Sequence, residues 1–181
     1  MPLQRTVFFL WAMFFVSLAT AEPQTACLKQ VFEGYCLGGD FQQLARQRPG
    51  GMPAQSEGDR SALVYQLGRE RLYVMAYQGR IYKILHTYEP ASQTTLKALL
   101  QQLEGKYGPY RDQSHYPGYA RALASQIGAI RRGEGELVYV WQRPDEAWRI
   151  ELTWTRKLGI SLAYLVNDLD TKQREAVVQG L

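Results

Sequence analysis

The fold is decided by residues 62–88, which read ALVYQLGRERLYVMAYQGRIYKILHTY. Residues with high strand propensity fill three segments of this stretch, at 62–67, 72–77 and 80–88. The two interruptions between them are polar and contain glycine, which is typical of turns. The stretch therefore predicts a meander of three antiparallel strands, which ends at Pro90.

A second group of strand-like segments follows nearer the C-terminus, at 137–142, 148–155 and 160–166. The connections between these segments contain Pro144 and Gly159, which favour turns. In the middle segment every second residue is Trp, Ile or Leu, so one side of that strand is expected to lie in the core. A second three-stranded meander is predicted.

Helical spacing of apolar residues marks the segments outside the meanders. The strongest stripe runs from Leu96 to Tyr107, with Ser92 placed to cap its helix, and another covers 119–130. Short helices are predicted at 28–35 and directly after Asp40. A polar helix is expected from about residue 170 onward.

This order of elements predicts an α+β fold, in which an antiparallel sheet of two three-stranded meanders carries helices packed on one face. Residues 22–181 are expected to form a single secreted domain, with possible sub-halves at 22–89 and 90–181. A tandem helix-helix-strand-strand-strand repeat would explain the order, but the few sequence matches between the halves fall at different offsets, so coincidence stays open. The doubled order resembles the architecture of the secreted beta-lactamase inhibitor proteins, and one unit resembles the small lipoprotein of the outer-membrane assembly machine. The sequence contains no motif specific to either.

Residues 1–21, MPLQRTVFFLWAMFFVSLATA, have the features of a Sec-type signal peptide. Arg5 precedes an apolar run, and Ala19-Thr20-Ala21 has the small-x-small pattern after which signal peptidase cuts. An uncleaved membrane anchor is the alternative, although the uncharged run is shorter than the roughly 20 residues that a spanning helix needs. We expect cleavage after Ala21 and a periplasmic or secreted location in a bacterial cell.

Cys27 and Cys36 are the only two cysteines, and both follow the predicted cleavage site. In an oxidising compartment such an isolated pair is expected to form one disulfide bond. The alternative is a lipoprotein in which Cys27 is acylated, but the residues before it do not match that motif.

Composition and charge exclude several classes of protein. Of the 181 residues, 46% are hydrophobic and 12% aromatic, which is too rich in core-forming residues for intrinsic disorder. A formal net charge of +4 is well below that of a dedicated nucleic-acid binder. We therefore expect no nucleic-acid partner and membrane contact only through the signal segment, and the sequence leaves the oligomeric state open.

Few residues suggest catalysis or metal binding. His86 and His115 are the only histidines, and neither belongs to a metal-binding or nucleophile motif. Asp168 and Asp170 have a spacing that can hold a divalent ion, but a role at the start of the last helix explains them without a metal. The sequence predicts no catalytic residue, no metal site and no cofactor.

The candidate binding surface lies in the first meander, where strand residues alternate between two sides of the sheet. The aliphatic side of the second strand is expected to face the core, which directs Tyr73 and Tyr77 to the opposite side. In the third strand, Tyr82, His86 and Tyr88 share one side. If these sides coincide, the sheet presents a face of amphipathic rings suited to a protein or sugar partner. Burial of the rings under a loop or helices is the alternative.

These features predict an exported, non-enzymatic bacterial binding protein that recognises a protein or a cell-wall component as an inhibitor or an assembly factor. The alternative is a cell-envelope hydrolase that uses carboxylates or His86. A sheltered cleft joining His86 to two carboxylates would favour the hydrolase, and an open aromatic sheet face would favour the binding protein.

Overall fold

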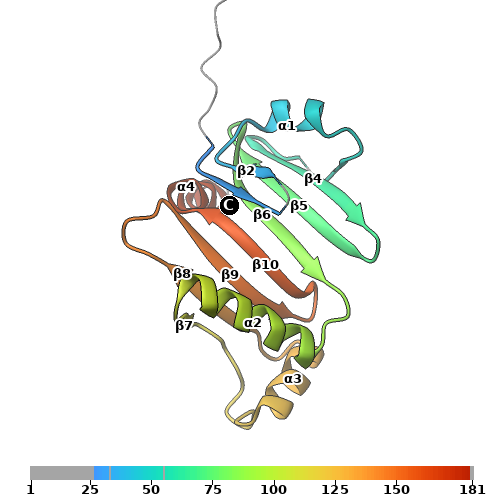
Figure 1. Ribbon diagram of the computed structural model, residues 1–181, viewed down its shortest axis with the longest axis vertical. Coiled ribbons are helices and arrows are strands. Elements are labelled where there is room, and N and C mark those ends of the chain that lie inside the picture. The colour runs from blue at the N-terminus through green and yellow to red at the C-terminus, as the bar shows by residue number, and fades with distance from the viewer. Residues whose placement is uncertain (1–26, 33, 55, 180–181) are drawn as a thin grey trace, which may run out of the picture.

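The computed structural model describes residues 27–32, 34–54 and 56–179 of the chain (Figure 1). The predicted signal peptide at residues 1–21 lies outside these residues. Within them the chain forms four α-helices, an eight-stranded antiparallel sheet and a separate two-stranded hairpin. The predicted α+β class with an antiparallel sheet is confirmed.

The first meander consists of β4 (Arg60–Leu67), β5 (Glu70–Tyr77) and β6 (Arg80–Tyr88), close to the positions predicted from the sequence. Each strand pairs antiparallel with the next. Gln78 and Gly79 form the β5–β6 turn, with φ angles of 50° and 75°. Two successive positive φ angles give the twist that a two-residue hairpin turn needs.

The second meander consists of β8 (Leu137–Gln142), β9 (Trp148–Thr155) and β10 (Gly159–Val166), again as predicted. Two-residue strands, β3 (Met52–Pro53) and β7 (Arg111–Asp112), flank the two meanders. β10 pairs antiparallel with β6, so both meanders belong to one sheet with the order β3-β4-β5-β6-β10-β9-β8-β7.

Two helices begin at the predicted caps. The side chain of Asp40 accepts a hydrogen bond of 2.6 Å from a backbone N–H in the first turn of α1 (Phe41–Gln47). Ser92 Oγ accepts the equivalent bond, of 3.1 Å, at the start of α2 (Gln93–Tyr107). These bonds satisfy backbone donors that have no partner within the helix, and so they fix where each helix starts.

The other two helices are α3 (Leu123–Arg132) and α4 (Asn167–Gln179). α3 lies beyond one end of the strands, near the β9–β10 turn (Figure 1). α4 follows β10 directly and begins earlier than the predicted start near Asp170. Asp168 and Asp170 therefore lie within its first turn, where negative charge is favourable, rather than ahead of it.

The predicted helix at 28–35 is wrong. This segment forms a hairpin of β1 (Lys29–Val31) and β2 (Tyr35–Leu37), and a disulfide bond joins Cys27 to Cys36 across it. Helical spacing over a single short window cannot be told from a strand pair, because eight residues contain only two turns of the pattern. The cross-link and the buried side of β2 stabilise the hairpin instead.

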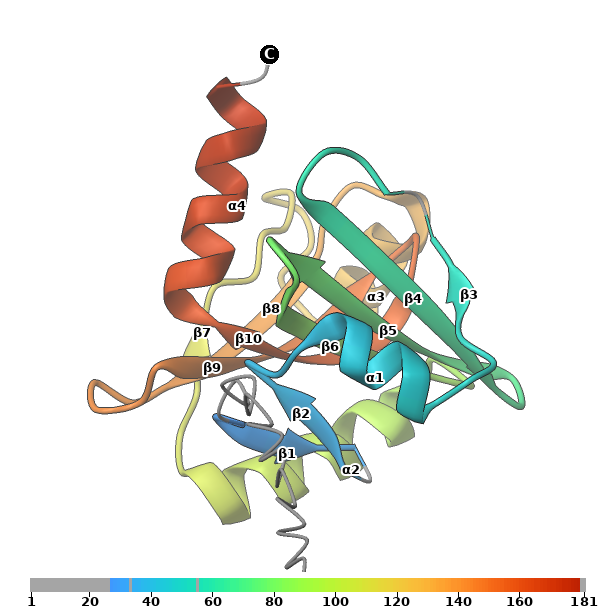
Figure 2. The same cartoon turned by 90° about the horizontal axis from the view of Figure 1, so that it is seen from above.

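The two faces of the large sheet differ in what covers them. α2 and the β1–β2 hairpin lie over one face, which we call the front face, whereas α4 leaves from the opposite, back face (Figures 1 and 2). α4 is thus an exception to the predicted packing of helices on one face. An ion pair holds its first turn there, since Asp170 Oδ2 lies 2.6 Å from the guanidinium of Arg149 in β9.

The main core lies between the front face and α2. Alternate strand side chains meet one stripe of α2 there, and nearly all solvent is excluded from Leu72, Val74, Ile84, Ile150, Leu152, Ile160, Leu96, Leu99 and Leu103. Trp141 Nε1 donates a hydrogen bond of 2.8 Å to the carbonyl of Gly108, which ties the end of α2 to the sheet. None of the helices in the described residues is long and apolar enough to cross a membrane.

The tandem repeat of residues 22–89 and 90–181 is not confirmed. The two meanders correspond, and β3 and β7 hold equivalent places at the ends of the sheet. However, in the described residues the first half places a hairpin and one helix before its meander, whereas the second half places two helices there.

Candidate functional site

The register of β5 and β6 places the predicted binding residues on two faces of the sheet. Leu72 lies directly opposite His86, so His86 and Tyr88 share the front face with the core. Tyr73 and Tyr77 lie on the back face. The tyrosine-bearing sides of the two strands therefore do not coincide.

Tyr82 is separated from His86 and Tyr88 by an irregularity in β6. Met75 pairs with Lys83 and Ala76 with Ile81, which leaves Tyr82 as an extra residue between the pairs. Its hydroxyl lies 3.9 Å from Met75 Sδ, on the back face. Such a bulge shifts the alternation of side chains by one residue, so Tyr82 joins Tyr73 and Tyr77.

On the front face, His86 belongs to a half-buried cluster. His86 Nε2 lies 2.9 Å from Glu70 Oε2, and the rings of Tyr88 and Phe32 pack against the imidazole at centroid distances of 4.6 and 5.4 Å. Burial, and then the nearby charge of Glu70, raise the pKa of Tyr88 to about 12, so its hydroxyl keeps its proton at neutral pH. One carboxylate of the described residues, that of Glu70, contacts the imidazole of His86.

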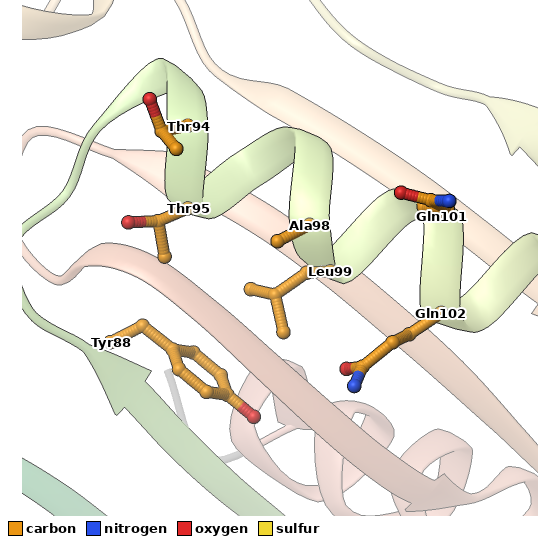
Figure 3. Close-up of a pocket in the computed structure, with 7 residues that line it drawn as sticks. All are labelled: Tyr88, Thr94, Thr95, Ala98, Leu99, Gln101 and Gln102. Carbon is orange, nitrogen blue, oxygen red and sulfur yellow. The ribbon is translucent and has the colours of Figure 1, made fainter.

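A shallow groove runs beside this cluster, between Tyr88 and α2 (Figure 3). In Figure 3 the side chains of Leu99 and Gln102 extend from α2 toward the side of the groove on which Tyr88 lies. The volume of the groove is about 670 Å³, and its lining is Tyr88, Thr94, Thr95, Ala98, Leu99, Gln101 and Gln102. The lining is uncharged, and it offers an aromatic ring with hydroxyl and amide groups.

The back face carries a second group of large side chains. Tyr73, Met75 and Tyr77 of β5 and Lys83 of β6 are each only partly exposed, and Tyr82 is 8% exposed. We call these five residues the back-face patch. Beside it, a hollow of about 250 Å³ separates the sheet from α4.

An ion-pair network borders the back-face patch. Arg149 of β9 contacts Glu151 at 2.8 Å and Asp170 at 2.6 Å, and Arg174 of α4 contacts the same Asp170 carboxylate at 3.0 Å. The side chain of Asp170 is 7% exposed, so this carboxylate depends on its two arginines for compensation. The network joins α4 to the back face.

Lys83 lies on the β10 side of the patch and has no such partner among the described residues. Within the described residues it forms no ion pair or hydrogen bond through its ammonium group. Burial lowers the pKa of Lys83, and the nearby charges of Glu151 and Asp170 oppose that shift only in part. A partly buried cation on an accessible sheet face makes this position a candidate for ligand binding.

Lys83 was not among the residues predicted from the sequence. The signal was present, because it is the one charged residue in the apolar run IYKIL of β6. A lysine on a strand is usually solvated, however, and the sequence alone does not place Arg149 and Asp170 beside it. No group of His, Cys, Asp and Glu in the part of the chain that the structure describes is arranged to hold a metal ion.

Comparisons with known proteins add little. No protein-family model matches the sequence, and no curated protein matches it. Among solved structures, a cysteine-rich secretory protein from Staphylococcus aureus subsp. aureus Mu50 is 8% identical, with a TM-score of 0.39 over 73% of this chain. The match spans 45% of that protein, less than half of its length. At this level of similarity it assigns neither a family nor a function.

Proposed function

We propose that this protein is an exported, non-enzymatic binding protein of the bacterial cell envelope, and that it binds a partner protein through the back-face patch. The observation that carries the proposal is the patch itself, in which Tyr73, Met75, Tyr77 and Lys83 are partly exposed on the back face of the sheet.

Export is supported by the disulfide bond between Cys27 and Cys36, since such bonds persist in oxidising compartments. The predicted signal peptide at residues 1–21 agrees with this location. The disulfide bond and the predicted signal peptide together support a periplasmic or secreted location.

The chemistry of the patch supports binding to a protein. Tyrosine supplies a large contact area with few rotatable bonds and a hydroxyl that can donate or accept a hydrogen bond, and the flexible thioether of methionine adapts to an irregular surface. Side chains of this type are enriched where proteins meet. The strands hold the patch on a rigid surface, so little ordering is needed on binding.

Joint replacement of Tyr73 and Tyr77 by serine tests the proposal. Tyr82 is left intact because it is nearly buried and its loss would affect folding. Wild-type and variant proteins are used to capture partners from an envelope extract, which are identified by mass spectrometry and then titrated in purified form. The double variant should bind the purified partner at least about tenfold more weakly.

A matched control is Tyr119→Ser, because Tyr119 is 58% exposed and lies far along the chain, between β7 and α3. Circular dichroism verifies that all variants are folded. Unchanged affinity of a folded Tyr73/Tyr77 variant would contradict the proposed surface. Binding to purified cell wall but to no protein would assign the patch to a wall polymer instead.

One observation favours the alternative, a cell-envelope hydrolase. The His86–Glu70 pair, at 2.9 Å, lies beside Tyr88 and the groove of Figure 3. Hydrolysis of a chromogenic ester or of labelled wall polymer by the wild-type protein, lost in the His86→Gln variant, would support this function. Equal background rates for both proteins would leave the binding protein as the proposal.

A further inference from the structure

We infer that the back-face patch binds a carboxylate group of the partner protein, with the ammonium group of Lys83 as its counter-ion and the ring of Tyr73 beside it. This inference rests on the proposed function and specifies the chemistry that the partner presents.

The register of the sheet surrounds Lys83 with apolar neighbours. Met75 of β5 and Leu165 of β10 pair directly with Lys83 on either side, and Leu85 is its neighbour on the same face of β6. The aliphatic stem of the lysine is therefore packed along apolar side chains, with its charge at the end of that stem. A cation in this position loses hydration that the protein does not replace.

Among Lys83 and the charged residues of the network, Lys83 is the residue whose charge has no ion-pair partner. The network contains two carboxylates, Glu151 and Asp170, and both are already engaged by Arg149 and Arg174. With Lys83 included, the group holds three cations and two anions. Charge complementarity therefore favours an anionic group from outside the described chain.

The size of this charge excess favours a carboxylate over a phosphate. A phosphate group carries up to two charges and is usually bound by several donors, such as paired arginines or backbone N–H groups. Here the ammonium group of Lys83 is the one partly buried cation without an ion pair among the described residues of the patch, because Arg149 and Arg174 are occupied by Asp170. Arg71, which donates to the hydroxyl of Tyr73 at 3.3 Å, is exposed at the edge of the patch. One carboxylate on an otherwise apolar protein surface fits both this partly buried charge and the partly exposed ring of Tyr73.

Docking of a carboxylate would also relieve the cost of burying Lys83. Burial disfavours the charged form of Lys83 in the free protein, and a carboxylate at contact distance favours that form. Lys83 loses most of its hydration when the protein folds, so binding of the partner requires little further desolvation of this lysine. The free protein is thus prepared for an acidic side chain of its partner.

Capped hexaglutamate and hexaglutamine peptides serve as probes for this experiment. At low salt, where charge interactions are weakly screened, the wild-type protein should bind hexaglutamate at least about tenfold more tightly than hexaglutamine. Amide resonances of β5, β6 and β10 should shift during the titration. In the Lys83→Met variant the preference should disappear, whereas Lys83→Arg should keep most of it.

The matched control is Lys157→Met, which removes the same charge from an exposed position in the β9–β10 turn and should keep the preference. Equal binding of the two peptides by the wild-type protein, or a preference that survives in Lys83→Met, would overturn the inference. If the partner protein depends on Tyr73 and Tyr77 but tolerates Lys83→Met, the proposed function stands and this inference is wrong. If both sets of variants bind normally, both proposals are wrong.

Discussion

The ammonium group of Lys83 is held in the folded protein at a cost in stability. Its neighbours in the sheet, Met75 and Leu165, are apolar, and burial lowers its pKa from the ordinary value of 10.5. Sites of this kind are commonly retained because binding needs them, even though folding does not. The residue that best marks the candidate site is therefore also one that destabilises the fold.

Replacing Lys83 by methionine should raise the free energy of unfolding at pH 7 by about 1 kcal/mol, because methionine fills similar space without a buried charge. For a protein of this size, that gain corresponds to an increase in Tm of about 3 °C. Differential scanning calorimetry of wild type and Lys83→Met measures the difference. Lys157→Met, at an exposed position, should leave Tm unchanged.

The gain should depend on pH with a defined sign. The folded-state pKa of Lys83 is lowered, so the unfolded chain binds this proton more tightly than the folded protein does. The destabilisation is complete below the folded-state pKa and disappears as the pH rises to the unfolded value. The Tm difference between Lys83→Met and wild type should thus be largest near neutrality and shrink toward pH 10.5. A constant difference across this range would contradict the role of its charge.

At the scale of elements, the strands and helix caps were predictable because each depends on local residues. The turn at Gln78-Gly79 and the caps at Asp40 and Ser92 act within a few residues of chain. The hairpin at 28–37 was not predictable in this way, because its spacing also fits a helix. The sequence predicts that Cys27 and Cys36 form a disulfide bond, but it does not predict that the bond closes a hairpin.

The candidate site was predictable only in part, because the sequence does not reveal the register in which β5 pairs with β6. Tyr73 and Tyr77 were correctly paired on one side of β5. The irregularity at Tyr82 shifts the alternation of β6, and no sequence pattern marks it, so the prediction that Tyr82 shares a side with His86 and Tyr88 is wrong. The pairing of His86 with Leu72 depends on the register of β5 and β6, which the sequence left open. The network around Lys83 depends on contacts between β6, β9 and α4, which are distant in sequence.

α4 should depend on the carboxylate of Asp170. Asp170→Asn removes the charge that holds Arg149 and Arg174, and leaves the half-buried guanidinium of Arg149 with less compensation. We expect a loss of about 2 kcal/mol in stability, together with faster amide exchange throughout α4. Hydrogen exchange followed by mass spectrometry distinguishes local opening of α4 from a loss of stability of the whole protein. Asp168→Asn, which changes an exposed residue of the same turn, is the control.

The β1–β2 hairpin should depend on its cross-link more than the rest of the protein does. The disulfide closes a loop between residues nine apart in sequence, which contributes about 2.5–3 kcal/mol on the chain-entropy model. Joint replacement of Cys27 and Cys36 by serine should therefore lower Tm by several degrees and leave the large sheet folded. Near-native circular dichroism at 25 °C would agree with this, whereas complete unfolding would show that the hairpin is essential to the core.

At the scale of the whole molecule, the pairing of β6 with β10 makes the two meanders one structure. Ile84 of β6 and Tyr164 of β10 lie opposite each other at this junction, and both are buried. A continuous core across the junction predicts one cooperative unfolding transition rather than two.

Ile84→Ala tests this cooperativity, because Ile84 is fully buried and its truncation should cost about 3–4 kcal/mol. Three of the four tryptophans, Trp141, Trp148 and Trp154, lie in β8 and β9, in the other meander. Urea unfolding followed by tryptophan fluorescence should shift as far as unfolding followed by circular dichroism. A fluorescence midpoint that stays at the wild-type value would show that the halves fold independently.

The two shortest strands determine how the large sheet ends. β3 and β7 are each two residues long, and Pro53 of β3 has no N–H to donate. A row of unpaired backbone groups would allow another chain to extend the sheet by strand addition, and these brief borders offer almost none. Strand addition to β3 or β7 is therefore limited to a few residues at each margin of the sheet. We therefore expect the proposed partner to contact side chains on a face of the sheet, so that its recognition depends on residue identity rather than on backbone pairing.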